Sequence, residues 1–358
     1  MHYNIALIGF GGVNRGLVEI LEAQSEKLTK TLGFSLNIVA VSDLFQGSVY
    51  RPEGIDLTQL KNLPIEKGSL AAISGGSTEA DNENIIKNSN ADIIVEATIT
   101  DAKTGEPAST HCAWALAAGK HVSTTNKGPV ALAAKKLIAL AEQHHVAFEY
   151  EGVVMSGTPV LRFAQSQLKG NKTASFQGIL NGTANYVLEQ MEQGSSLNAA
   201  ITKAQDLGYA EANPAADIEG GDARLKVVIL ANSLFGCDIG VEDVGCAGIT
   251  CLTPEIVEQA VKENCHWKLV GQARQDKNGK ITACVAPQKL SGQHPLAGIS
   301  GATNAVSFQT DLLGSVTISG PGAGRIETAY AVLSDIISID QKFGHKSLAN
   351  KSPERKTA

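Results

Sequence analysis

The most constraining feature of this sequence is a glycine-rich motif between an apolar run and an amphipathic stretch. The run Asn4–Ile8 predicts a strand, the motif spans Gly9–Gly16, and Val13–Leu28 predicts a helix. Glycines at such a junction let the backbone approach a pyrophosphate, which the helix N-terminus binds through its amides and partial positive charge. The spacing is imperfect, because Asn14 stands where a third glycine is usual. We predict a dinucleotide-binding turn, with a purely structural turn as the alternative.

Strand-like and helix-like segments alternate through the first 150 residues. Further strands are expected at 36–42, 91–97, 121–125 and 146–151, and helices at 107–118 and 129–145. This alternation predicts an α/β fold with a Rossmann-like, doubly wound parallel sheet. The polar segment 46–88 is expected to be an irregular surface excursion with short helices.

After residue 150 the pattern changes to that of an α+β domain. Helical windows lie at 159–169, 183–193, 197–207 and 222–235, and strand windows lie at 173–180, 281–287, 304–309 and 315–319. We therefore expect a dinucleotide-binding domain over 1–150, a substrate-binding, catalytic and dimerisation domain over 151–319, a helix over 320–345 that returns to the first domain, and a flexible tail over 346–358.

Composition narrows the class of protein. The chain has 358 residues, of which 43% are hydrophobic and 18% charged, with a net charge of −6. These values are typical of a globular enzyme of about two domains, and they argue against a broad nucleic-acid surface. No signal peptide or membrane-spanning run is evident, and the six cysteines form no CxxC pair. We expect a cytoplasmic enzyme with reduced thiols and no nucleic-acid or membrane partner.

Two residues at the ends of predicted strands are candidate ligand contacts. Asp43 ends the second strand, where an acid can bind the adenosine ribose hydroxyls and favour NAD, whereas Arg51 could meet the 2′-phosphate of NADP. The choice of coenzyme therefore stays open, and an Asp that only caps a turn is the alternative. Lys127 follows a strand and opens a helix, at the sheet edge where ligands bind. A solvated surface lysine is the alternative there.

The stretch 204–235 holds the densest group of ionisable residues. Asp222 and Lys226 are four residues apart and share one helix face. Glu211 and Asp217 precede them, next to a pair of glycines. An ammonium among carboxylates near a nicotinamide can bind an amino acid and move its proton, although an ordinary surface ion pair is the alternative.

The segment Glu149–Pro159 is a glycine-containing loop between a strand and a helix. Glu151 and free backbone carbonyls could bind a hard monovalent cation through oxygen. An interdomain hinge is the alternative.

Taken in order, these motifs resemble those of the homoserine dehydrogenases, which interconvert L-homoserine and L-aspartate 4-semialdehyde. The resemblance covers about residues 3–340, and its most specific parts are Asn181–Tyr186 (NGTANY) and Asp217–Lys226 (DIEGGDARLK). Less specific matches lie at 9–16, 96–98, 125–129, 207–214 and 320–324.

The resemblance implies a role for each matching residue. Lys226 would donate the proton in aldehyde reduction, and Lys127 would lie at the substrate and the nicotinamide. Glu211 and Asp222 would hold the amino group of homoserine, and Asp217 would line the same pocket. The candidate NAD(P) contacts are Gly9, Gly11, Gly12, Val13, Asn14, Asp43, Thr98, Asn126, Lys127, Gly208 and Gly322. A sodium or potassium ion would bind Glu151 and the carbonyls of Val154, Ser156 and Thr158.

Some features depart from the family pattern. Asn14 replaces a frequent glycine, the cation loop lacks the common Gly-Gly form, and Asn213 stands where Asp is frequent. We expect neither the regulatory amino-acid-binding domain that many relatives carry after the position of residue 340 nor an aspartate-kinase domain before residue 1. We therefore expect weak or no threonine inhibition through such a module.

We expect an NAD(P)-dependent homodimer that acts in threonine, methionine and isoleucine biosynthesis. Another NAD(P)-dependent dehydrogenase of a related small amino acid is the alternative. A non-catalytic dinucleotide sensor would lack the lysine–carboxylate group that this chain carries.

Overall fold

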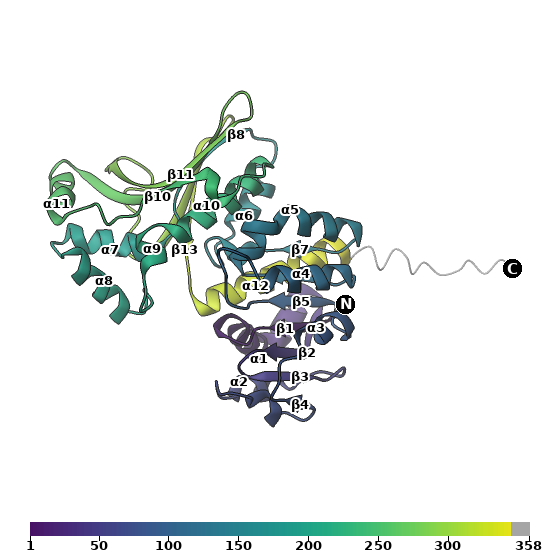
Figure 1. Cartoon of the computed structure of the whole chain (residues 1–358). Coiled ribbons are helices and arrows are strands. Elements are labelled where there is room, and N and C mark those ends of the chain that lie inside the picture. The colour runs from purple at the N-terminus through teal and green to yellow at the C-terminus, as the bar shows by residue number, and fades with distance from the viewer. Residues whose placement is uncertain (345–358) are drawn as a thin grey trace. The chain divides into compact units, whose positions relative to one another are not determined.

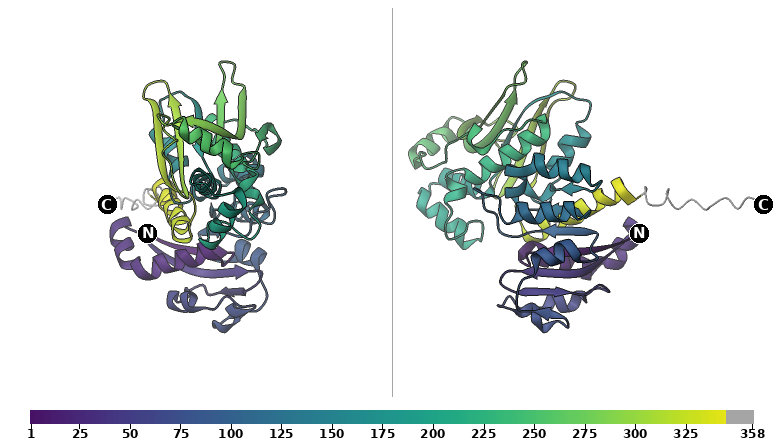
Figure 2. Two further views of the ribbon diagram at one scale, coloured as in Figure 1. Left: turned by 90° about the vertical axis from the view of Figure 1, so that its left-hand side faces the viewer. Right: turned by 45° about the vertical axis from the view of Figure 1, so that its right-hand side comes forward.

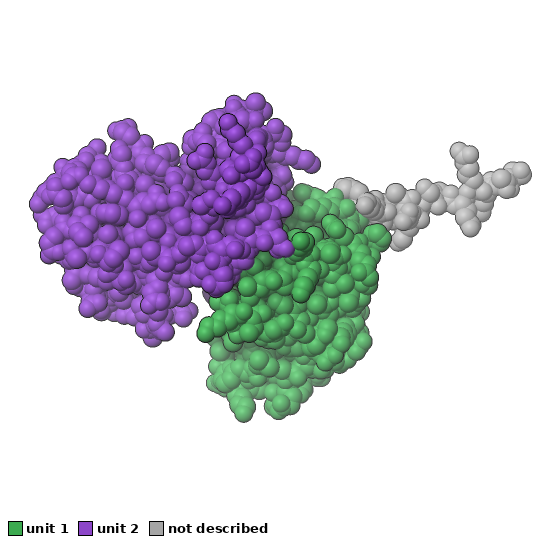
Figure 3. Space-filling model, turned by 45° about the horizontal axis from the view of Figure 1, so that its top comes forward, with its two compact units in different colours: residues 1–152, 328–358 green, residues 153–327 purple. Residues whose placement is uncertain are grey.

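The computed structural model describes residues 1–344, which form two compact units (Figures 1 and 3). Among the described residues, unit 1 comprises 1–152 and 328–344, and unit 2 comprises Val153–Glu327. The tail expected over 346–358 lies outside the described residues. Within the described part of the chain, no helix is long and apolar enough to cross a membrane.

Unit 1 is built on a seven-stranded sheet in the order β4-β3-β2-β1-β5-β6-β7. β1 (His2–Ile8) pairs in parallel with β2 (Ser35–Asp43) on one side and with β5 (Ile93–Glu96) on the other. β6 (His121–Thr124) and β7 (Phe148–Glu149) continue the parallel arrangement. The strand order reverses at β1, so the carboxyl ends of β1 and β5 form a switch point, where such sheets bind ligands. The Rossmann-like prediction is confirmed.

Helices cover both faces of this sheet. The helices α1 (Gly12–Leu32), α2 (Leu57–Asn62) and α12 (Arg325–Ile339) pack with Tyr3, Ile5 and Leu7 of β1 in the main core of unit 1. The opposite face is covered by α3 (Asn82–Asn88), α4 (Ala108–Ala117) and α5 (Lys127–Gln143).

The segment 46–88 is more regular than we expected. β3 (Gly47–Tyr50) and β4 (Gly76–Ser77) extend the sheet in antiparallel fashion beyond β2, and a 3-10 turn spans Ser69–Ala72. These strands are short and their flanks are polar, so hydrophobic periodicity gives no signal for them.

Unit 2 contains a mixed six-stranded sheet in the order β13-β12-β8-β10-β11-β9, whose long strands run in green and yellow in Figure 2. Its strands are β8 (Thr173–Ile179), β9 (Val244–Cys246), β10 (Cys265–Gln275), β11 (Ile281–Ser291), β12 (Thr303–Thr310) and β13 (Gly314–Pro321). The sequence did not predict β9 or β10, since Gly271, Gln272 and Arg274 interrupt the apolar alternation of the longer one. The α+β character of the second domain is confirmed.

Helices α7, α10 and α11 contact the sheet of unit 2. The helices of this unit are α6 (Val160–Arg162), which continues into a π-helical turn at Phe163–Gln167, α7 (Gly182–Glu192), α8 (Leu197–Asp206), α9 (Ala215–Ile218), α10 (Gly221–Phe235) and α11 (Pro254–Lys262). The middle of α10 is buried all round, so this helix is a fixed support for the polar residues in its first turns.

Candidate active site

The turn after β1 leaves the N-terminus of α1 open at the switch point. Gly9 has φ +81°, and a Cβ at this position would lie 2.7 Å from the carbonyl oxygen of Ala97, so only glycine fits. Gly11 caps α1 and Gly12 begins it, and both are exposed. The first-turn amides of a helix have no partner within the helix, so they are ready donors for an anion. The turn therefore fits a pyrophosphate.

The side chain of Asn14, the third residue of α1, points into the protein. It is fully buried, and its Nδ2 donates to the carbonyl oxygen of Gly9 at 2.6 Å. Asn14 thus supports the glycine turn from behind, next to the half-buried Val13.

The carboxylate of Asp43 ties the end of β2 to the glycine turn. One oxygen accepts the Phe10 amide at 2.8 Å, and the other accepts the amides of Phe45 and Gln46 at 2.9 and 3.0 Å. Asp43 therefore caps the turn that follows β2, and it also binds the neighbouring glycine turn through Phe10. The exposed side chain of Leu44 follows it.

Two arginines near this end of the site are already engaged. Arg51 lies 2.7 Å from the carboxylate of Glu53. The guanidinium of Arg15 donates to the backbone carbonyls of Phe10 and Leu63. Neither arginine is therefore a ready partner for a 2′-phosphate.

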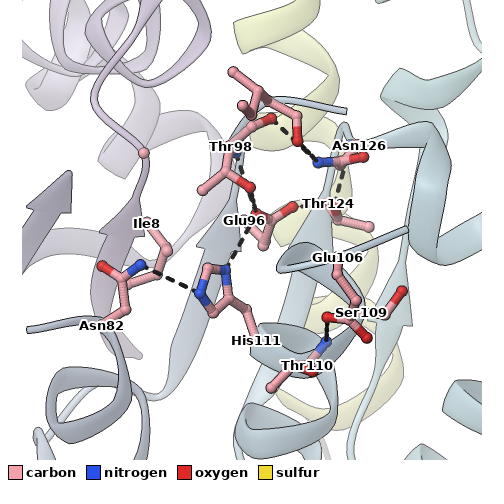
Figure 4. Close-up of polar contacts among 12 residues, drawn as sticks. Ile8, Asn82, Glu96, Thr98, Glu106, Ser109, Thr110, His111, Thr124 and Asn126 are labelled. Atoms are coloured by element: carbon pink, nitrogen blue, oxygen red, sulfur yellow. Dashed lines mark hydrogen bonds and ion pairs between the residues drawn. The ribbon is translucent and has the colours of Figure 1, made fainter. Parts of the chain in front are cut away.

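The ends of β5 and β6 bring Thr98 and Asn126 together, as Figure 4 shows. Asn126 caps α5, since its Oδ1 accepts the amide of Gly128 at 3.0 Å. Its Nδ2 donates to the carbonyls of Thr98 and Ile99 at 3.2 and 3.0 Å. Lys127 is half-buried at the first position of α5. These residues share the sheet edge that carries Gly9.

In unit 2, Lys226 belongs to a largely buried polar cluster. Its Nζ lies 2.7 Å from Oδ2 of Asp222 and donates to the carbonyl of Leu180 at 2.7 Å. Asn181, the cap of α7, donates through Nδ2 to Oδ1 of Asp217 at 2.6 Å and to Oδ2 of Asp222 at 3.0 Å. One ammonium, two carboxylates and one amide therefore meet where α7, α9 and α10 begin or end.

Electrostatics in this cluster favour the arrival of a cation. Burial raises the pKa of the Asp217 carboxyl, and the charge of Asp222 adds to the rise, whereas the hydrogen bond from Asn181 and the charge of Lys226 oppose it. A second ammonium beside the two acids would favour their ionised forms. The cluster is thus suited to bind the amino group of an amino acid.

Glu211 and Gly208 lie in the exposed loop between α8 and α9. Gly208 has φ +73°, and the adjacent carbonyl of Tyr209 accepts the hydroxyl of Thr183 at 2.5 Å. This bond fixes the loop to α7. Glu211 itself is exposed, outside the set of hydrogen bonds that joins Asp217, Asp222 and Lys226.

Gly322 follows β13 and packs against a buried amide. A Cβ at Gly322 would lie 2.1 Å from Oδ1 of Asn304, which is fully buried. Neither polar atom of the Asn304 side chain has a hydrogen-bond partner within the described residues. Sequence reasoning missed both Asn304 and Asn181. A lone Asn in an apolar strand, and an Asn directly before a helix, were the available signals.

The candidate cation loop has an unusual backbone. Met155 and Ser156 have φ values of 61° and 52°, and the side chains of Glu151, Ser156 and Thr158 are buried. The boundary between the two units runs through this segment, after Gly152. Among residues 1–344, no three His, Cys, Asp or Glu side chains are grouped to hold a metal ion, and a carbonyl-based site is of another kind.

Comparisons with known proteins agree along the chain. Residues 9–151 match the family model of the homoserine dehydrogenase NAD binding domain, and residues 159–337 match that of homoserine dehydrogenase. An NAD(+)-dependent homoserine dehydrogenase from Pseudomonas canavaninivorans is 54% identical over 96% of this chain and 98% of its own length. The homoserine dehydrogenase of Methanocaldococcus jannaschii is 38% identical over 94% and 98%.

Solved structures give the same result. A homoserine dehydrogenase from Thiobacillus denitrificans has a TM-score of 0.83 and 29% identity, covering 99% of this chain and 76% of that one. A hyperthermophilic archaeal homoserine dehydrogenase mutant in complex with NADPH has a TM-score of 0.82 and 30% identity, covering 96% and 99%. The chain therefore belongs to the homoserine dehydrogenase family of NAD(P)-dependent oxidoreductases.

Proposed function

We propose that Lys226 performs the proton transfer in the interconversion of L-homoserine and L-aspartate 4-semialdehyde. The observation that carries this proposal is its buried ammonium, which Asp222 and the Leu180 carbonyl hold at 2.7 Å. The nicotinamide coenzyme, when bound, supplies or accepts the hydride. In reduction, Nζ of Lys226 gives a proton to the developing alkoxide. Lys127 polarises the carbonyl from the start of α5.

The acidic residues bind the amino group of the substrate in this proposal. Asp217 and Asp222 already form an anionic pair through Asn181, and Glu211 contributes from the exposed loop before α9. Two or three carboxylates around one ammonium select an amino acid over a simple alcohol, because only a charged amino group gains a favourable interaction with the negative charge of the acids.

The proposed coenzyme contacts form two groups, one for the adenosine and pyrophosphate end and one for the nicotinamide end. The amides at Gly11, Gly12, Val13 and Asn14 bind the pyrophosphate, with Gly9 as the turn that brings them there. Asp43 binds the adenosine ribose. Thr98, Asn126 and Lys127 form the nicotinamide side, and Gly208 and Gly322 add backbone contacts where no side chain intrudes.

We propose that NAD⁺ is preferred to NADP⁺. The acidic Asp43 is followed by the apolar Leu44, and Arg51 is paired with Glu53, so a 2′-phosphate meets no ready cation. The relative from Pseudomonas canavaninivorans carries the name NAD(+)-dependent. Homoserine-dependent reduction of both coenzymes should give a kcat/KM ratio of at least about tenfold in favour of NAD⁺.

A charge-gain variant sharpens this test. Leu44→Arg should raise kcat/KM for NADP⁺ and so lower the ratio of the NAD⁺ to the NADP⁺ value. Ile256→Arg, which adds the same charge to the exposed face of α11 in unit 2, should leave this ratio unchanged. Equal use of both coenzymes by the wild-type protein would contradict the proposed preference for NAD⁺. A wild-type protein that oxidises no homoserine with either coenzyme would contradict the proposed substrate.

We propose that a sodium or potassium ion binds the segment Glu151–Thr158, through the Glu151 carboxylate and the carbonyls of Val154, Ser156 and Thr158. The left-handed backbone at Met155 and Ser156 and the burial of the loop support an oxygen site. Thermal unfolding in sodium or potassium chloride should occur at higher temperature than in choline chloride of equal ionic strength. Identical melting temperatures would contradict the site.

We propose a homodimer formed through the open face of the unit 2 sheet. This face has a hollow of about 760 Å³, and its lining is mostly neutral, with Ser175, Gln177, Gln272, Ser307 and Gln309 among its residues. Light scattering should show a dimer. Gln177→Arg should give monomers, because it places like charges across a two-fold contact, whereas Gln59→Arg, at an exposed position of α2 in unit 1, should not. A monomeric wild-type protein contradicts the proposal.

A further inference from the structure

The carboxylate of Glu96 is a buried ionisable group that this mechanism does not use. It is fully buried at the end of β5. It accepts hydrogen bonds from the backbone amide of Thr98 at 3.2 Å, from the Thr98 hydroxyl, and from the Thr124 hydroxyl at 3.1 Å (Figure 4). Burial of a carboxylate is unfavourable unless hydrogen-bond donors surround it. These three hydrogen bonds replace the water that Glu96 loses on burial.

A second series of hydrogen bonds points at the same carboxylate. The amide of Asp81 donates to the Ser42 hydroxyl at 3.0 Å, and that hydroxyl donates to Oδ1 of Asn82 at 2.6 Å. Because Oδ1 of Asn82 accepts from Ser42, the side-chain Nδ2 of Asn82 faces Nε2 of His111, at 3.2 Å. Nδ2 can only donate, so Nε2 is the acceptor.

The tautomer of His111 follows from this direction. A neutral imidazole that accepts at Nε2 carries its proton on Nδ1. That atom lies 3.6 Å from Oε1 of Glu96, which is a close approach but longer than a hydrogen bond. The His111 ring thus presents its N–H edge to the Glu96 carboxylate, on which the Thr98 and Thr124 donors also converge.

The residues that Glu96 holds are joined to one another through Asn126. The Thr98 carbonyl accepts Nδ2 of Asn126 at 3.2 Å, and the Thr124 hydroxyl oxygen accepts the Asn126 amide at 3.1 Å. Asn126 caps α5, whose first residue is Lys127. A single buried carboxylate therefore links the ends of β5 and β6 to the start of α5.

We propose that Glu96 is a positioning residue for the coenzyme: it holds Thr98, Asn126 and the start of α5 in the geometry that binds the nicotinamide. Glu96 has no exposed surface, so it acts through Thr98 and Thr124 and does not touch the ligand itself. This inference rests on the proposed assignment of Thr98, Asn126 and Lys127 to the nicotinamide side.

The proposal separates the two ends of the coenzyme. The adenosine and pyrophosphate end depends on the glycine turn, which Asp43 holds through the Phe10 amide. The nicotinamide end depends on Glu96. ADP-ribose, which lacks the nicotinamide, should therefore be insensitive to Glu96, whereas a purely structural role would affect both ligands alike.

The test is calorimetric titration of Glu96→Gln with NAD⁺ and with ADP-ribose, together with homoserine kinetics. Gln keeps the shape but turns one acceptor into a donor that opposes the Thr98 and Thr124 hydrogens. We expect NAD⁺ to bind about tenfold more weakly, equivalent to about 1.4 kcal/mol, and ADP-ribose within about twofold of wild type. The kcat should fall while KM for homoserine is unchanged. Equal losses for both ligands, or no loss, would overturn the proposal.

A second pair of variants covers the case in which Glu96→Gln does not fold. Thr124→Val removes the hydroxyl between Glu96 and Asn126, and Thr124→Ser keeps it. Only the valine variant should show the NAD⁺-selective loss, and identical behaviour of the two would refute the proposal. Wild-type protein that binds ADP-ribose and NAD⁺ equally well would instead remove Thr98 and Asn126 from the nicotinamide side, which is a failure of the proposed function.

Discussion

Lys226→Met is expected to lower kcat for homoserine oxidation and for semialdehyde reduction by about 10³-fold, the usual size of a general acid–base contribution. Methionine keeps most of the side-chain volume but cannot donate or accept the proton. NAD⁺ affinity should stay within about twofold of wild type, because Lys226 lies in the cluster of unit 2 and not at the glycine turn. Steady-state kinetics in both directions and a coenzyme titration measure the two effects.

Lys268→Met is the matched control, since Lys268 is another buried lysine of unit 2. Its Nζ donates to Oδ1 of Asn185 at 3.1 Å and to the carbonyl of Ile299 at 2.6 Å, and burial lowers its pKa. Its loss should reduce the free energy of unfolding and leave kcat within about threefold. If the two variants lose activity equally, the effect is one of packing and Lys226 is not the proton donor.

Gly9→Ala is expected to weaken NAD⁺ binding by at least about 100-fold, and to lower the free energy of unfolding by about 2 kcal/mol. The added Cβ would lie 2.7 Å from the Ala97 carbonyl oxygen, on a residue with φ +81°. The turn has to move, and the first-turn amides of α1 move with it. Denaturant unfolding and NAD⁺ titration of the folded protein are the two measurements.

Gly119→Ala separates strain from collision. Gly119 has φ +74°, similar to Gly9, but a Cβ there meets nothing within 4 Å. It should lose about 1 kcal/mol of stability through the left-handed backbone alone, with unchanged NAD⁺ affinity. A Gly9→Ala protein that binds NAD⁺ like wild type would show that the turn is not the pyrophosphate site.

Local patterns explain which parts of the site could be predicted. The glycine motif is contained in one strand–turn–helix unit, and Asp222 and Lys226 are neighbours by helix geometry alone. Asn181 joins Asp217 and Asp222 from 36 and 41 residues away, so its place depends on how the start of α7 lies relative to α9 and the start of α10. No periodicity carries that information.

The burial of Glu96 is likewise a tertiary result. Its sequence neighbours indicate only the end of a strand, whereas one of the three hydrogen bonds to its carboxylate comes from Thr124 and the imidazole beside it belongs to His111. The short strands β3 and β4 were missed for a related reason. They are strands because β2 offers an edge to β3 and β3 offers one to β4, and their own residues barely alternate.

Unit 1 is formed by two segments from opposite ends of the sequence, which matters while the chain is being synthesised. Val332, Leu333, Ile336 and Ile339 of α12 pack in the same core as Ile5 and Leu7 of β1. A nascent chain that has not reached Thr328 must therefore keep this apolar face of its first sheet incompletely covered. The coenzyme-binding unit starts first and is completed last, so part of its apolar core stays open to non-native contacts for as long as the rest of the chain is being made.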